Sequence, residues 1–177
     1  MAALPALITV EQFREMPDDG RDYELHCGEV VSVTRPKSKH FKLQCRLVRI
    51  LQARTGGEVT METPYRAVAE FDLRAADVAI VSRARWDAID PEDNLHGAPE
   101  LVIEVKSPSN TKRKLRELSS LCLNNGSLEF WIVDTQQSSV TVVHRDGSTT
   151  LYQSGQSIPL TSFGAGALTV DEIFAVS

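Results

Sequence analysis

The stretch Glu100-Leu101-Val102-Ile103-Glu104-Val105-Lys106-Ser107-Pro108 decides the fold of this chain. Its residues alternate as in a β-strand, in which successive side chains point to opposite faces of the sheet. One face holds Leu101, Ile103 and Val105, and the other holds Val102, Glu104 and Lys106. We assign the apolar face to the core, so that a carboxylate and an ammonium group share the other face. Pro108 ends the strand, because proline has no N–H to donate to a neighbouring strand.

A second apolar strand, over residues 77–82, lies upstream and opens with an acid, Asp77. Two acids on neighbouring strands, with Lys106 two residues after Glu104, can hold a divalent cation and activate a water molecule. The same residues would also fit a solvated ion pair and a polar residue that opens a strand, which is a common arrangement. The choice between these two interpretations depends on the rest of the chain.

The length and composition of the chain indicate a single soluble domain over residues 1–177. A mass of 19.6 kDa is enough for a substantial core, and 42% hydrophobic residues with a mean hydropathy of −0.18 are ordinary for a soluble protein. No apolar run is long enough to cross a membrane, and the first seven residues lack the positive leader of a signal peptide. Cys27, Cys45 and Cys122 are far apart and form no Cys-x-x-Cys pair, so we expect a reducing cytoplasm and no structural zinc.

The basic residues are concentrated in two places, although the net charge is −5. Between Glu29 and Glu58 there is no acid, and this stretch carries Arg35, Lys37, Lys39, Lys42, Arg46, Arg49 and Arg54. A second cluster, Lys112-Arg113-Lys114 with Arg116, follows the Glu104 strand. Such sidedness would let one face bind a phosphate backbone while the rest stays acidic, although each cluster alone also fits a solvated helix face.

The pattern of apolar residues predicts a mixed α/β fold. We expect helices over residues 10–16, 38–54, 84–89 and 111–125, and a short C-terminal helix that opens with a capping box at 169–172. Strands are expected over residues 23–25, 29–33, 59–62, 65–71, 77–82, 100–108, 128–134, 139–144 and 149–152. Pro64 would lie at a turn, and residues 90–97 would form a polar loop. The strand–helix–strand segment from 100 to 134 predicts two parallel strands with a right-handed crossover.

Several patches of the chain, in this order, resemble the PD-(D/E)XK nuclease superfamily and, within it, the bacterial Uma-two family of restriction-endonuclease-like proteins. The patches are Tyr23-Glu24-Leu25 with Gly28-Glu29, Pro36 and His40, Arg74 three residues before Asp77, residues 98–105 with Ser107-Pro108, and Gly126 with residues 129–134. Departures occur at Ala76, which replaces a proline, and at Leu118 and Cys122, where relatives often carry a lysine and a tyrosine.

The resemblance implies a restriction-endonuclease-like core, with a central mixed β-sheet flanked by helices, and metal-dependent hydrolysis of nucleic acid, with DNA as the expected substrate. It places the catalytic roles on Asp77, Glu104 and Lys106. The implied ligands of Mg²⁺ or Mn²⁺ are Asp77, Glu104, the Val105 carbonyl and Glu24. By analogy a homodimer is expected, because one site cuts one strand at a time.

Nucleic-acid contacts are expected from the basic residues nearest this site. The candidates are Lys37, Lys39, His40, Lys42, Arg74, Lys112, Arg113 and Lys114. His40 could instead touch a second metal or simply be exposed, and Arg74 could instead pair with an acid. We interpret His26 and His144 as structural.

Two further functional classes remain open. The chain could be a nuclease fold without turnover that binds nucleic acid or protein, or an interaction protein that binds no metal. Salt-sensitive DNA binding without metal would favour the first, and the absence of Mn²⁺ binding would favour the second.

Overall fold

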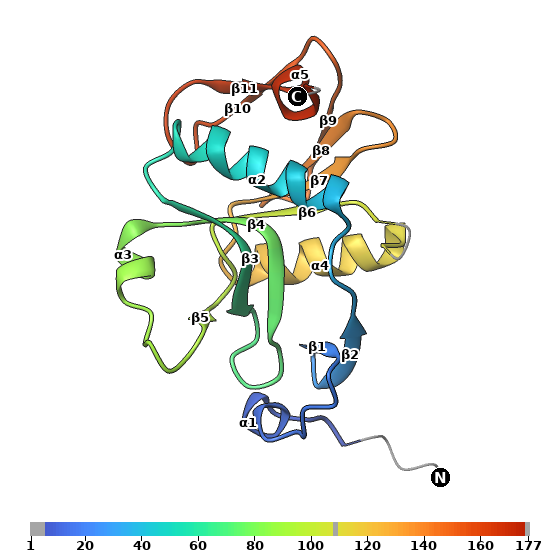
Figure 1. The fold of residues 1–177 in the computed structure, drawn as a ribbon. Coiled ribbons are helices and arrows are strands. Elements are labelled where there is room, and N and C mark those ends of the chain that lie inside the picture. The colour runs from blue at the N-terminus through green and yellow to red at the C-terminus, as the bar shows by residue number, and fades with distance from the viewer. Residues whose placement is uncertain (1–5, 108–109, 176–177) are drawn as a thin grey trace.

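A seven-stranded mixed sheet forms the centre of the molecule in the computed structural model, which describes residues 6–107 and 110–175. The strand order is β5-β3-β4-β6-β7-β8-β9 (Figure 1). The strands are β3 (Glu58–Arg66), β4 (Arg74–Val81), β5 (Leu95–His96), β6 (Leu101–Val105), β7 (Glu129–Asp134), β8 (Ser139–His144) and β9 (Thr149–Tyr152). This confirms the predicted mixed α/β fold with a central mixed sheet.

The stretch that opens the sequence analysis forms β6, which lies near the middle of the sheet. It pairs in parallel with β7, and the two are joined by helix α4 (Lys112–Asn124), as the crossover pattern predicted. On its other side β6 runs antiparallel to β4, with Val78 opposite Ile103 and Ile80 opposite Leu101. One step further along this register, Asp77 lies opposite Glu104. Directly opposed residues point to the same face, so the two acids share one side of the sheet.

Helices cover both faces of the sheet (Figure 1). Helix α2 (Ser38–Gln52) packs on one face, together with helix α5 (Val170–Phe174) and the small sheet of β10 (Ser157–Pro159) and β11 (Ala167–Thr169). Helix α4 packs on the other face, where Cys122 and Leu123 meet Val102 and Phe130. Val102 and Ile103 of β6 are buried on opposite faces, and Glu104, near the C-terminal end of the strand, is its one polar residue.

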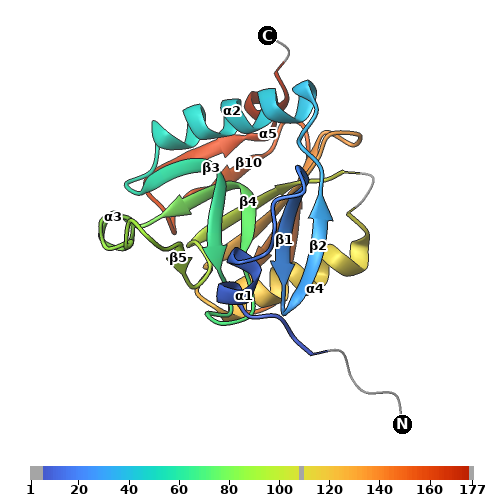
Figure 2. The same cartoon turned by 60° about the horizontal axis from the view of Figure 1, so that its bottom comes forward.

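The N-terminal hairpin of β1 (Asp22–His26) and β2 (Glu29–Val33) lies beside the N-terminal part of β4 (Figure 2). Backbone hydrogen bonds between Leu25 and Leu73 fix this position. The short helix α1 (Val10–Arg14) precedes the hairpin and starts with the predicted capping box of Thr9 and Gln12. Glu24, on β1, therefore lies beside the first residues of β4.

Three parts of the predicted secondary structure were wrong. Pro64 does not lie at a turn: β3 continues through it, opposite Ala75. This is possible because β5 pairs with β3 only from Tyr65 onward, so no donor is needed on the other side of Pro64. Residues 65–71 do not form a separate strand, because the chain turns after Arg66, where the N–H groups of Phe71 and Asp72 both bond to the Val68 carbonyl.

The third error is the segment 90–97, which is not entirely loop, because β5 joins the sheet there in parallel with β3. Helix α3 (Arg83–Asp87) lies within one residue of its predicted start, and the predicted capping box at Thr169 begins α5. The predicted strand end at Pro108 lies outside the described residues. No helix among the described residues is both long enough and apolar enough to span a membrane.

Candidate active site

Asp77, in the middle of β4, is the centre of a group of polar side chains beside the C-terminal end of β6. Its Oδ2 accepts a hydrogen bond from the Val105 N–H at 2.7 Å, which ties the carboxylate to β6. Its Oδ1 lies 2.9 Å from His40 Nε2 and accepts a hydrogen bond from Gln44 Nε2 at 3.0 Å, both from helix α2. The carboxylate is only 17% exposed. The bond to Asp77 raises the pKa of His40, against the lowering effect of its own burial.

Glu104 lies opposite Asp77 and is the most perturbed acid of the group. Burial raises the pKa of its carboxyl well above the usual range, and the negative charges of Asp77, Glu24 and Glu62 raise it further. A positive charge nearby would favour the ionised form of this carboxyl. Perturbation by burial together with neighbouring like charges is typical of functional sites.

Glu24, the further acid that the resemblance implies as a metal ligand, lies beside this group on the N-terminal hairpin. Its Oε1 accepts a hydrogen bond from the Ala75 N–H at 3.2 Å, next to the start of β4. Its Oε2 lies 2.6 Å from His26 Nε2. His26 therefore has an acidic partner in the site, which sequence reasoning missed because no pattern links it to Glu24 beyond their shared strand face.

Two further members, Glu62 and Gln44, were also missed. Gln44 Nε2 donates to Glu62 as well as to Asp77 and so bridges the two carboxylates. Partial burial raises the pKa of Glu62, and the charge of Asp77 adds to this effect. Gln44 could have been found, because it lies four residues after His40 and hence on the same face of α2. Glu62 could not, because its position depends on β3 continuing through Pro64.

Lys106 follows Glu104 on the same strand, but its ammonium group is engaged elsewhere. Its Nζ bonds to Asp134 Oδ2 of β7 at 2.7 Å, and this bond lowers the pKa of Asp134. The two residues lie against a shallow cavity of about 170 Å³, which is also lined by Ser107, Asn110 and Gln136. The structure therefore brings Asp77, Glu104 and Glu24 into one group, and places Lys106 at its border with Asp134 as partner.

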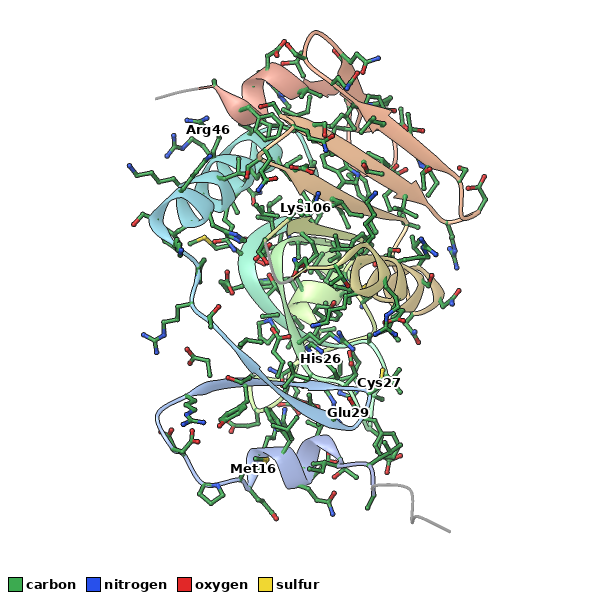
Figure 3. All side chains as sticks on the ribbon, turned by 90° about the vertical axis from the view of Figure 1, so that its right-hand side faces the viewer. Met16, His26, Cys27, Glu29, Arg46 and Lys106 are labelled. Carbon is green, nitrogen blue, oxygen red and sulfur yellow. The ribbon has the colours of Figure 1, made fainter. Side chains whose placement is uncertain are left out.

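The expected nucleic-acid contacts divide into exposed and engaged residues. Lys37, Lys39 and Lys42 are exposed at the start of α2, and Lys112, Arg113 and Lys114 are exposed at the start of α4. Both helices begin at the same edge of the molecule, and Figure 3 faces this edge with Lys106 between them. Neither helix has an acid in its first turn. The lysines therefore add their charge to the partial positive charge of each helix N-terminus, where cations are normally disfavoured.

Arg74 does not belong to this exposed set. Its guanidinium donates to the buried carboxylate of Asp72 at 2.7 Å, in agreement with the alternative that it pairs with an acid.

Arg46, on α2, donates to the carbonyls of Ile173 and Ala175 and so attaches the C-terminal helix. Arg54 does the same through Glu172. The basic stretch over residues 35–54 therefore has exposed lysines at the start of α2 and arginines that hold α5 in place.

The donor chemistry of the acidic group fits a hard divalent cation. Carboxylates and a backbone carbonyl are the ligands that Mg²⁺ and Mn²⁺ prefer, and burial together with the neighbouring acids raises the pKa of Glu104. The N–H groups of Val105 and Gln44 donate to Asp77, and His40 Nε2 lies within hydrogen-bond distance of it. Within residues 6–107 and 110–175, no three His, Cys, Asp or Glu side chains form a ready-made metal site.

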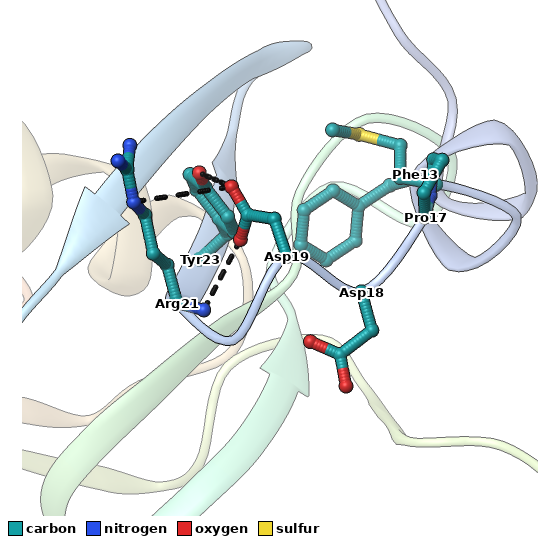
Figure 4. Close-up of a pocket in the computed structure, with 7 residues that line it drawn as sticks. Phe13, Pro17, Asp18, Asp19, Arg21 and Tyr23 are labelled. Atoms are coloured by element: carbon teal, nitrogen blue, oxygen red, sulfur yellow. Dashed lines mark hydrogen bonds and ion pairs between the residues drawn. The ribbon is translucent and has the colours of Figure 1, made fainter.

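A separate hollow lies between α1 and β1 (Figure 4). It has a volume of about 170 Å³ and is lined by Phe13, Met16, Pro17, Asp18, Asp19, Arg21 and Tyr23. Asp19 accepts hydrogen bonds from the Tyr23 hydroxyl at 2.8 Å and from the Arg21 N–H at 3.1 Å. These contacts hold the Asp18–Arg21 turn, and none of the acids grouped around Asp77 lines this hollow.

Comparisons with known proteins agree with this architecture. The crystal structure of a protein described as a putative nuclease belonging to DUF820, from Anabaena variabilis, superposes with a TM-score of 0.79. It is 19% identical, and the alignment covers 95% of this chain and 98% of that one, so the likeness concerns the fold. No curated protein matches the chain. A family model, described as Uma2, putative restriction endonuclease, matches residues 10–171. The chain therefore belongs to this family of restriction-endonuclease-like proteins.

Proposed function

We propose that this protein is a Mg²⁺- or Mn²⁺-dependent endonuclease that hydrolyses phosphodiester bonds of DNA. The observation that carries the proposal is the pairing of Asp77 with Glu104. They lie on adjacent strands, in direct opposition, and the burial of Glu104 and the surrounding charges raise its pKa. Family membership supports nuclease chemistry in general, and the choice of cation and substrate is our inference from the donor set.

The residues proposed to hold the cation are Asp77, Glu104, Glu24 and the Val105 carbonyl. A bound cation of this kind lowers the pKa of coordinated water and offsets charge on phosphate oxygens. Hydrogen bonds from the Val105 N–H and from His40 orient the Asp77 carboxylate, so that little reorganisation is needed when substrate arrives.

Lys106 is the proposed partner of the attacking water. Its position two residues after Glu104 places both side chains on one strand face, and its backbone N–H continues the ladder to the Val133 carbonyl. A change of side-chain rotamer that releases Asp134 would aim the ammonium group at the acids. There it would orient the water and stabilise developing charge on the phosphate.

The exposed lysines at the starts of α2 and α4 are the proposed contacts to the nucleic-acid backbone. The two helices begin at the same edge of the molecule, on the side where Lys106 lies (Figure 3). Such contacts position a strand without reading its sequence. Because a single site cuts one strand, cleavage of duplex DNA calls for two copies, and we propose a homodimer for that reaction.

The test is cleavage of plasmid DNA by the purified protein with Mn²⁺ or Mg²⁺. Nicking or cutting is expected from the wild type and from Asp18→Ala, a matched surface control. Asp77→Ala and Lys106→Ala should lose it while their circular dichroism stays unchanged. Cleavage by both site variants at the wild-type rate would refute the assignment.

A second candidate, a binding module without turnover, is favoured by one observation: Lys106 is paired with Asp134 and not with the acids. In that case DNA should bind without metal, and the affinity should fall steeply with salt because phosphate contacts release counterions. Binding of this kind without any cleavage would select the second candidate.

A further inference from the structure

Phe41, on helix α2, is the one aromatic residue in the described part of the chain that is exposed, with 44% of its surface accessible to solvent. Cys45 lies four residues further along α2 and hence on the same side of the helix. Its Sγ is 3.9 Å from the Sδ of Met61 on β3, which is exposed as well. These three side chains form an apolar strip, which we call the Phe41 strip.

The position of the Phe41 strip carries the argument, because single exposed apolar side chains are common on protein surfaces. Phe41 directly follows His40, whose Nε2 lies 2.9 Å from Asp77 Oδ1. The Cα atoms of adjacent residues are about 3.8 Å apart, so the Phe41 backbone lies beside the proposed cleavage site. At the other end of the strip, Met61 directly precedes Glu62, whose carboxylate belongs to the same acidic group. A strand of nucleic acid held at Asp77 is therefore within reach of the strip.

The charges around Phe41 match those of a nucleic-acid backbone. The lysines that precede and follow it in the sequence are exposed, namely Lys37, Lys39 and Lys42, and residues 30–57 contain no acid. A phenylalanine ring among lysines can stack on a base while the lysines bind the neighbouring phosphates. A second copy of this chain fits the strip less well, because a symmetric contact would place these lysines against their own counterparts.

We propose that Phe41 is a base-stacking residue that receives an unpaired base next to the phosphodiester bond to be cleaved. In a continuous duplex both faces of each base are covered by its neighbours, so an aromatic ring can stack only on a base that is unpaired or displaced. The expected substrate is therefore DNA that is single-stranded at the cleavage site. The inference rests on the proposed function, because that function places the strand beside Asp77.

The experiment is a titration of a fluorescein-labelled single-stranded DNA of about 16 nucleotides with the full chain, followed by fluorescence anisotropy in EDTA to prevent cleavage. Loss of one stacked base in Phe41→Ala should weaken binding by roughly fivefold to a hundredfold. Phe41→Leu keeps an apolar side chain without a ring face and should weaken binding similarly, whereas Phe41→Trp should bind at least as tightly as the wild type. Binding of a fully paired duplex should be unchanged in all three variants.

Leu151→Ala is the matched control, because Leu151 is an apolar residue that is 52% exposed on β9, at the far edge of the sheet from β3. It should bind single-stranded DNA as the wild type does. Retained binding by Phe41→Trp is a result that a folding defect at position 41 would not produce.

The inference would be overturned if the wild type did not bind single-stranded DNA, or if Phe41→Ala bound it as tightly as the wild type. An equal loss of affinity for duplex DNA would also overturn it, as would a dimer that Phe41→Ala converts to a monomer with unchanged DNA affinity. Plasmid cleavage in Mn²⁺ without any effect of Phe41→Ala on single-strand binding would leave the proposed nuclease standing. Weakened single-strand binding by Phe41→Ala, with no cleavage by the wild type, would support the stacking site and overturn the nuclease.

Discussion

Replacing Glu104 by glutamine should stabilise the protein when divalent cations are removed. Burial and three neighbouring acids raise the pKa of Glu104 above its ordinary value of 4.5. The folded state therefore binds the Glu104 proton more tightly than the unfolded state. Stability from this group is fully present below pH 4.5 and is lost as the pH rises through the folded-state pKa. The wild type bears this loss as the pH rises, and a neutral amide of the same size avoids it.

Substitutions at buried polar positions usually change the free energy of unfolding by about 0.5–3 kcal/mol, so we expect a gain on the order of 1 kcal/mol at pH 8. For a domain of this length that corresponds to roughly 2–4 °C in Tm. Near pH 4.5 the gain should vanish.

Urea unfolding in EDTA from pH 4.5 to 8 would measure this difference. Glu100→Gln is the matched control, because Glu100 has an ion-pair partner in Arg85 at 3.0 Å and should lose about 1 kcal/mol. Adding Mn²⁺ should favour the wild type, by about 2.7 kcal/mol at a hundred times the Kd. A Glu104→Gln protein that is less stable than wild type at pH 8 in EDTA would refute the reasoning.

Three further predictions concern the framework. Hydrogen bonds from His96, from Arg14 and from the buried Arg66 lower the pKa of Asp93, so Asp93→Asn should cost about 2–3 kcal/mol at pH 7 by urea unfolding. That deficit should shrink only below pH 3.8, and a deficit independent of pH down to 2 would contradict it. Trp131→Phe leaves the buried Glu129 without its indole donor and should cost about 1–3 kcal/mol by thermal unfolding at pH 7; an unchanged Tm would contradict this. Removing the N-cap of α5 by Thr169→Ala should cost about 1 kcal/mol and speed amide exchange in that helix, whereas unchanged exchange would argue against the cap.

Much of the fold could be predicted from the sequence, because apolar alternation and capping residues are local signals. The strands around Glu104 and Asp77 and the crossover through α4 follow from such signals. The strands β10 and β11 could not be predicted, since three residues each are too few to show alternation. Pro64 was misassigned because its tolerance depends on β5 leaving one side of β3 open, which is a tertiary fact.

The sequence pattern predicts that Asp77 and Glu104 share one face of the sheet, but it does not predict the side chains that hydrogen-bond around them. Alternation along a strand fixes the face of Asp77 and Glu104, so their shared side could be inferred. The long, flexible side chain of Lys106 is not fixed in this way, and it bonds to Asp134 across the parallel pair of strands. Glu62 and Gln44 come together only through the packing of α2 over β3, which no local pattern encodes.

The most direct test of the central claim is the anomalous scattering of a crystal soaked in Mn²⁺. We predict a peak in contact with the carboxylates of both Asp77 and Glu104. A Mn²⁺ ion bound only at Asp134, or a fully soaked crystal with no peak between the two acids, would contradict the account.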